Sequence, residues 1–296
     1  MRTTFRSIAA TMICAAAAVA AAQYAPTPSA PAHLQAGESM ARGIYNQGRQ
    51  GMVLDALSKP YNNYGASWGS TVFEFGTFGP NSTGQIVQLT PFTNNTVCAN
   101  FVTHSLMTAY PLWDWSAYTL ANGGTTVSPD PAQMAYFINN NKGLTKVTDP
   151  TSIKAGDIIA IDYASYPNGA GNVGHAMIVR SKLGVTTTKA PKANPDHVYY
   201  LHKFGIVDST ATPHDKVIDG LDSRNYTTLT GTTVQSKGAG VGVFYIVTDK
   251  DNSIKGYLWD NVAPTMSASI DTIFADKHQS QAKRPMTIGR YVPVAP

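Results

Sequence analysis

The order of helix-like and strand-like segments along the chain is the feature that most constrains its fold. Apolar residues recur at helical spacing after Cys98, and a second helix is expected over 129–141. From residue 156 on, short apolar runs bounded by glycine and turn residues predict strands. The expected strands span 71–75, 84–90, 156–162, 174–179, 198–207, 241–247 and 287–292. Helices that precede most of the strands indicate an α+β fold, with N-terminal helices packed on an antiparallel sheet.

Both expected helices carry boundary signals. Thr96 or Asn95 is expected to cap the helix that begins at Cys98, because a short polar side chain there accepts from free backbone N–H groups. Ser128 is expected to cap the second helix, with Pro129 at its first position, where the missing N–H of proline has no consequence.

The first 22 residues have the pattern of an export signal. Arg2 and Arg6 form a basic start, an alanine-rich apolar run follows, and small residues close it. The run is too short for a convincing membrane span, so we expect cleavage near Ala22 and a secreted or periplasmic protein without an integral membrane segment. The remainder divides into a lead-in and helix over 23–60, with a flexible Pro- and Ala-rich part to 35, and one domain over 61–296.

Charge and residue spacing exclude several classes of partner. Removing Arg2 and Arg6 takes the basic residues from 22 to 20 against 18 acidic ones, a formal charge of +2, and no Lys/Arg-rich stripe occurs. A nucleic-acid partner is therefore not expected. No two histidines show metal-site spacing and one cysteine remains after cleavage, so we expect no zinc and no other cofactor.

Cys98 is the candidate nucleophile. Cys14 leaves with the export signal, so Cys98 stays as the one cysteine and no internal disulfide can form. The first turn of a helix is the positive end of the backbone dipole, which favours the nucleophilic thiolate. The alternative is a buried apolar filler, since free cysteine packs well in protein cores. The choice between them depends on whether the chain supplies a base and an orienting group.

His175 is the candidate base. It opens an expected strand directly after a glycine-rich loop, where a ligand or backbone can approach closely. His104 is a poor candidate, because six steps along a helix place it on a different face from Cys98. The alternative for His175 is a structural histidine whose hydrogen bonds are satisfied within the fold.

The strand at 198–207 and its continuation offer two orienting groups, His202 and Asp208. They lie roughly 20 Å apart along an extended strand, so only one can reach His175. If the strand from His175 continues through the β-branched run 185–188, His175 lies opposite the Asp208 region; if it ends near Ser181, it lies opposite His202. The β-branched run favours the longer strand, which predicts Asp208 as the group that fixes the His175 tautomer.

Four short motifs, taken in order, resemble the NlpC-like cysteine hydrolases of cell walls and their CHAP amidase relatives, which have a papain-like fold. The motifs are Asn-Thr-Val-Cys-Ala-Asn-Phe-Val at 95–102, Lys-Ala-Gly-Asp-Ile-Ile-Ala-Ile at 154–161, Gly-His-Ala-Met-Ile-Val at 174–179 and Ile-Val-Asp-Ser-Thr at 206–210. The resemblance implies Cys98 as nucleophile, His175 as base, Asp208 as the third polar residue, and peptidoglycan or another peptide as substrate.

The chain departs from the family pattern at several positions. Val97, Ala99 and Asn100 surround Cys98 where the family usually has Asp-Cys-Ser-Gly, and an aspartate stands where a His, Asn or Gln is more usual. The stretch 209–242 has no counterpart, and its His214 is expected to be a loop histidine, with the option that it joins the site. Hydrolysis of an amide is the expected function. The alternatives are acyl transfer by the same residues and a non-catalytic envelope protein that keeps the fold.

Overall fold

The computed structural model describes residues 30–41, 72–74, 78–80, 86–88, 93–110, 112–163, 173–189, 198–215, 221–227, 231, 233–235, 238–259 and 279–292. The expected export signal over 1–22, the expected helix beyond residue 41 and the glycine-rich loop over 164–172 lie outside these residues. Among the helices described, none combines the length and the apolar character that crossing a bilayer requires.

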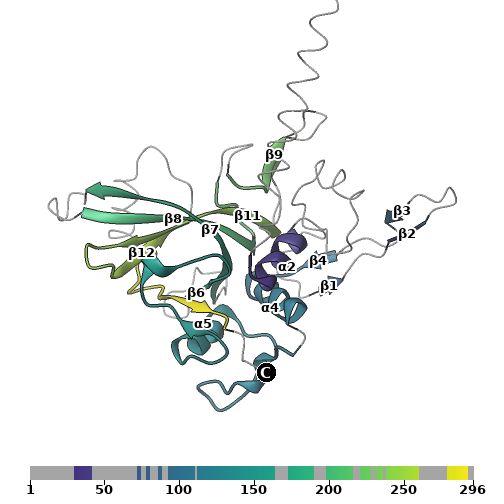
Figure 1. Cartoon of the computed structure of the whole chain (residues 1–296), viewed down its shortest axis with the longest axis horizontal. Coiled ribbons are helices and arrows are strands. Elements are labelled where there is room, and N and C mark those ends of the chain that lie inside the picture. The colour runs from purple at the N-terminus through teal and green to yellow at the C-terminus, as the bar shows by residue number, and fades with distance from the viewer. Residues whose placement is uncertain are drawn as a thin grey trace, which may run out of the picture.

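The fold is α+β, as expected, and a seven-stranded sheet forms its centre (Figure 1). Every pair of neighbours in this sheet is antiparallel. In spatial order its strands are β12 (Ile254–Leu258), β11 (Gly238–Thr248), β8 (Val198–Thr210), β7 (Gly174–Lys189), β6 (Ile158–Asp162), β13 (Met286–Arg290) and β5 (Thr145–Lys146). The short strands β5 and β12 were not expected from the sequence, because neither carries a clear apolar alternation.

Three two-stranded sheets complete the described strands. They pair β1 (Val72–Glu74) with β4 (Thr93–Asn95), β2 (Phe78–Pro80) with β3 (Ile86–Gln88), and β9 (Asn225–Thr227) with β10 (Thr233–Gln235). The strands expected over 71–75 and 84–90 are therefore confirmed at their centres. The strand β2, which was not expected, lies between them in the sequence.

Three α-helices pack on one face of the sheet: α2 (Ala32–Ala41), α4 (Cys98–Ala109) and α5 (Pro131–Asn139). Their apolar side chains form one core with Ile158, Ile178 and Val207 of the sheet. Because strand side chains alternate between faces, the intervening residues, among them Met177 and Ile206, form a second core on the other face. By the same alternation, the side chains of His175 and Asp208 lie on the face of the sheet that carries Met177 and Ile206.

The helix boundaries correct three expectations. The N-cap of α4 is Val97, which makes no side-chain cap, so neither Thr96 nor Asn95 has that role. The helix α5 begins two residues later than expected, because Asp130 and Gln133 form a reciprocal capping box that places Pro131 in the first turn. Residues 32–35 belong to α2 and not to a flexible lead-in, since Leu34 is fully buried in the core.

Candidate active site

Cys98 is the first residue of α4 and is 4% exposed. The first intrahelical bond of this turn runs from the Phe101 N–H to the Val97 carbonyl, so the N–H groups before Phe101 have no acceptor within the helix. The Cys98 thiol lies 3.9 Å from the carbonyl oxygen of Gly174, the residue before His175. The first turn of α4 and the start of β7 therefore meet at the sulfur atom.

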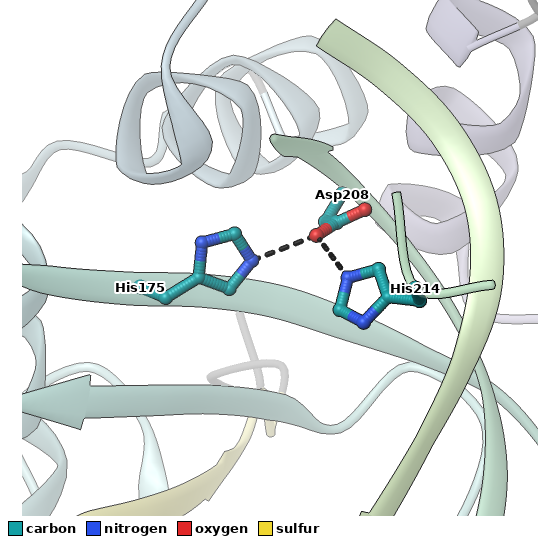
Figure 2. A group of neighbouring side chains, drawn as sticks. All are labelled: His175, Asp208 and His214. Carbon is teal, nitrogen blue, oxygen red and sulfur yellow. Dashed lines mark hydrogen bonds and ion pairs between the residues drawn. The ribbon is translucent and has the colours of Figure 1, made fainter. Parts of the chain in front are cut away.

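The His175 ring points toward Asp208, with its Nε2 atom 2.7 Å from Asp208 Oδ2 (Figure 2). Cys98 lies beside the ring and acts on its proton affinity, and since Nε2 faces Asp208, Nδ1 is the atom available for the sulfur. Burial disfavours the imidazolium, but the interactions of the ring with Cys98 and with the Asp208 carboxylate outweigh it, so the pKa of His175 is raised. A raised pKa suits an imidazole that accepts a proton.

Asp208 reaches His175 because β7 is long. The strand continues through the β-branched run to Lys189, as the longer of the two expected alternatives requires. Its register against β8 pairs Ile178 with Val207. If this register is followed toward the start of β7, His175 and Asp208 are diagonal neighbours on the same face of the sheet. The structure thus brings Cys98, His175 and Asp208 together.

His202 does not reach this group. It lies farther back along β8, opposite Val185, and its Nε2 atom is 3.1 Å from the hydroxyl of Thr248. The open question of whether His202 replaces Asp208 is therefore answered by the register of two strands. His202 is a buried histidine of the sheet, outside the candidate site.

His214 joins the site, contrary to its expected role as a loop histidine. Its Nε2 atom is 2.9 Å from Asp208 Oδ2, the oxygen that also contacts His175 (Figure 2). Its Nδ1 atom is 3.0 Å from the backbone carbonyl of Trp259. The side chain is fully buried, and the Trp259 indole stacks on it with ring centroids 4.1 Å apart.

Arg224 and Asp222 extend the group behind Asp208. Arg224 donates from Nη1 to Asp208 Oδ1 at 2.8 Å, and from Nε and Nη2 to the two oxygens of Asp222, both also at 2.8 Å. All three side chains are buried. Asp222 and Arg224 come from the stretch that had no family counterpart, so no motif or periodicity indicated them.

This arrangement keeps Asp208 ionised. Burial favours the protonated acid, but the positive charges of Arg224 and His214 and the hydrogen bonds of the two histidines hold the pKa of Asp208 well below its usual range. The pKa of Arg224 is raised, because its two carboxylate partners outweigh the effect of burial. The carboxylate therefore stays ionised, and available to His175, to a lower pH than an ordinary aspartate.

A cleft of about 1060 Å³ opens over Cys98 and His175. Its walls come from α4, the segment before α5, the start of β7, the end of β8 and the residue after β12. Three of its side chains are apolar and exposed, namely Met107, Val127 and Val173. Arg284 contributes a cation whose guanidinium lies 4.0 Å from the centroid of the Tyr163 ring. Among the described residues, the cleft therefore offers apolar contacts together with the charged side chains of Arg284 and Asp130.

His175, Asp208 and His214 are also the one group in the described part of the chain with three metal-type ligand atoms within 4.8 Å of one another. Sequence spacing did not reveal it. The atoms are separated by hydrogen-bond distances of 2.7 and 2.9 Å, and Arg224 occupies the second carboxylate oxygen. Tetrahedral zinc requires each ligand atom at roughly 2.0–2.2 Å from the ion, which spreads the ligands farther apart. The geometry fits a hydrogen-bonded network better than a metal centre.

Comparison with known proteins identifies no family: no protein-family model matches the chain, and no solved structure matches it. An uncharacterized protein of Acanthamoeba polyphaga mimivirus is similar to it, with 24% identity over 185 residues that cover 62% of this chain and 76% of the relative. The name of that relative assigns no activity.

Proposed function

We propose that this protein is an exported cysteine hydrolase with a papain-like fold that cleaves an amide bond, with peptidoglycan peptides as the substrate class. The observation that carries the proposal is the Cys98–His175–Asp208 arrangement, with the thiol in the first turn of a helix and at the floor of a cleft. The substrate class rests on the resemblance of the four motifs to the NlpC-like hydrolases.

The proposed reaction begins when His175 takes the Cys98 proton. The thiolate attacks the amide carbonyl carbon, and the backbone N–H of Cys98 donates to the developing oxyanion. When the C–N bond breaks, His175 returns the proton to the leaving amine and a thioester remains on Cys98. His175 then deprotonates a water molecule that attacks the thioester, so that a carboxylic acid is released and the thiol is restored.

Asp208 has a defined part in each step. By accepting from His175 Nε2, it directs Nδ1 toward the sulfur and stabilises the imidazolium that forms twice in the cycle. Its own proton affinity stays low because of Arg224 and His214, so Asp208 remains an acceptor and takes no proton from His175.

The first experiment is the rate at which iodoacetamide alkylates Cys98 as a function of pH, in the wild type and in His175→Ala. After cleavage near Ala22, Cys98 is the one cysteine of the chain, so the reaction reports this site alone. An ordinary thiol titrates near pH 8.5 and an activated one well below 7. We expect fast alkylation at acidic pH in the wild type and loss of the acidic reactivity in the variant.

Digestion of purified peptidoglycan tests the substrate class. We expect new amino groups and soluble peptides from the wild type and none from Cys98→Ala, whose circular dichroism spectrum should match that of the wild type. Joined products in the presence of added amines would identify acyl transfer in place of hydrolysis. Full activity of Cys98→Ala would end the proposal.

The second candidate function is a non-catalytic envelope protein of the same fold. The observation that favours it is the changed surroundings of Cys98, where Val97, Ala99 and Asn100 replace the usual residues. An inert Cys98 in both the wild type and His175→Ala, together with binding to peptidoglycan without product release, would establish this alternative.

A further inference from the structure

His214 lies between two hydrogen-bond acceptors. Its Nδ1 atom is 3.0 Å from the Trp259 carbonyl oxygen, and its Nε2 atom is 2.9 Å from Asp208 Oδ2. A neutral imidazole carries a single N–H. In either neutral tautomer, the unprotonated ring nitrogen would therefore point its lone pair at the lone pair of an acceptor oxygen. The imidazolium donates from both nitrogens and satisfies both acceptors.

Protonated Asp208 would be the other way to satisfy this geometry, and the surroundings oppose it. Asp208 Oδ1 accepts from Arg224 Nη1 at 2.8 Å, and Oδ2 accepts from His175 at 2.7 Å. A carboxylate with these donors resists protonation, and its pKa lies well below the usual range. The proton that the geometry requires therefore belongs to His214.

The neighbours of His214 on every side suit a buried cation. The carboxylate of Asp208 on β8 contacts the His214 ring. Asp222 Oδ2 accepts from the backbone N–H of His214 at 2.6 Å, and Arg224 neutralises the charge of Asp222. The Trp259 indole stacks on the ring at 4.1 Å, and the uncharged Phe244 of β11 faces it at 6.3 Å. An indole face attracts a cation at this distance.

His175 of β7 is the other titratable group that faces His214, with the two ring centroids 6.2 Å apart. A fixed positive charge at that position acts on the Cys98–His175 pair in two ways. It repels the His175 imidazolium, and it favours the negative charge on the sulfur. Because both effects favour loss of a proton, they move the pH range of the Cys98–His175 ion pair toward lower pH.

We propose that His214 is a positioning residue that remains an imidazolium, holds Asp208 Oδ2 in line with His175, and sets the pH range in which Cys98 is reactive. The inference rests on the proposed function, because it gives Cys98 and His175 the roles of nucleophile and base. It assigns a role to a side chain outside the three residues that the sequence motifs identify.

Two variants of His214 separate its charge from its hydrogen bond. Gln has the reach of Nε2, so His214→Gln keeps a donor for Asp208 and removes the charge. Asn has the reach of Nδ1, so His214→Asn keeps the donor for the Trp259 carbonyl and loses both the charge and the bond to Asp208. His202→Gln is the matched control, because His202 is a buried histidine bonded to Thr248 at the far part of β8.

The readout is the iodoacetamide rate of Cys98 against pH. In His214→Gln we expect both inflections of this rate profile to move to higher pH by roughly one unit. Removal of a nearby positive charge raises both apparent pKa values of the Cys98–His175 pair. His214→Asn should show the same shift and, in addition, a plateau rate lowered about tenfold, because Asp208 no longer holds His175 in line. His202→Gln should leave the profile unchanged. A structural role for His214 would lower stability in urea and leave both limbs in place.

A measurement on the unaltered protein covers the case in which the variants fail to fold. The ¹⁵N resonances of the His214 ring should show both nitrogens protonated at the pH of fastest Cys98 alkylation, as the two acceptors on either side of the ring require. A neutral His214 ring at that pH, an unshifted profile in His214→Gln, or a stoichiometric metal ion held by the wild type and lost from His214→Asn would overturn the inference. An inert Cys98 in the wild type would instead overturn the proposed function.

Discussion

Asp208 is the residue through which the candidate site is connected to the charges buried behind it. One of its oxygens accepts from two histidines and the other accepts from Arg224. Such a carboxylate has a local role and a structural role at once, because the same atoms orient His175 and neutralise buried cations. Substitution here therefore changes both reactivity and stability.

Asp208→Asn should lower the free energy of unfolding by about 3–5 kcal/mol, because it removes one partner from a buried ionic group and leaves the cations behind uncompensated. Urea unfolding followed by fluorescence measures this change. Asp251→Asn is the control, since Asp251 pairs with Lys250 on the surface, where an ion pair contributes at most about 1 kcal/mol. Equal effects of the two substitutions would contradict the importance of the buried group.

The depressed pKa of Asp208 also predicts how stability depends on pH. The unfolded carboxyl binds its proton near pH 4, whereas the folded one does so at much lower pH. The contribution of Asp208 is therefore fully present above about pH 4 and is lost as the pH falls toward the folded pKa. Urea unfolding between about pH 2 and pH 7 should show a steep acidic loss in the wild type and a shallower loss in Asp208→Asn.

At the scale of elements, the candidate site depends on how closely the start of β7 approaches its neighbours. A Cβ atom at Gly174 would lie 2.1 Å from the Ile161 carbonyl oxygen on β6 and 2.7 Å from Pro131 Cβ at the start of α5. Glycine at this position lets three elements meet beside Cys98. The same backbone approach places His175 next to the first turn of α4.

Gly174→Ala should displace the start of β7, lower the free energy of unfolding by roughly 1–3 kcal/mol or more, and remove the acidic reactivity of Cys98. Urea unfolding and the alkylation profile test the two effects. Gly184→Ala is a matched control on the same strand, because its φ of +143° resembles the +155° of Gly174 and no atom lies within 4 Å of its added Cβ. If Gly184→Ala had the same effect on Cys98, backbone strain and not crowding would be the cause.

At the scale of the whole molecule, α2 belongs to the same core as the site. Leu34 and Met40 of α2 are fully buried in the core that also contains residues of α4 and the sheet. The carboxylate of Glu38, 1% exposed, accepts from Arg180 Nε of β7 at 2.5 Å. The helix therefore covers the sheet as an integral part of the fold.

Leu34→Ala should lower the free energy of unfolding by about 2–5 kcal/mol, the usual effect of a cavity in a core. Because α2 and the site share one core, tryptophan fluorescence and the exposure of Cys98 to alkylation should report the same urea midpoint. Leu112→Ala is the control, since Leu112 is 99% exposed. A shift in fluorescence alone would indicate that α2 unfolds separately from the site.

Local sequence signals predicted a large part of the fold. The α+β class, the helix that begins at Cys98 and the principal strands were all expected, because apolar periodicity acts over a few residues and burial of one face suffices to define an element. The β-branched run at 185–188 also predicted the length of β7, and that length set the register that brings Asp208 to His175. The side-chain caps failed, because Asp130 competes successfully with Ser128 and because α4 begins without a side-chain cap.

The buried charges behind Asp208 could not be predicted from the periodicity of the sequence. His214, Asp222 and Arg224 lie in the segment between β8 and β11, where the sequence shows no apolar periodicity. Whether a histidine is a loop residue or an ionic partner depends on which groups surround it, and those groups come from β8, β7 and the residue after β12. Periodicity records which face of an element is buried, whereas the electrostatic environment of a side chain arises when distant segments meet.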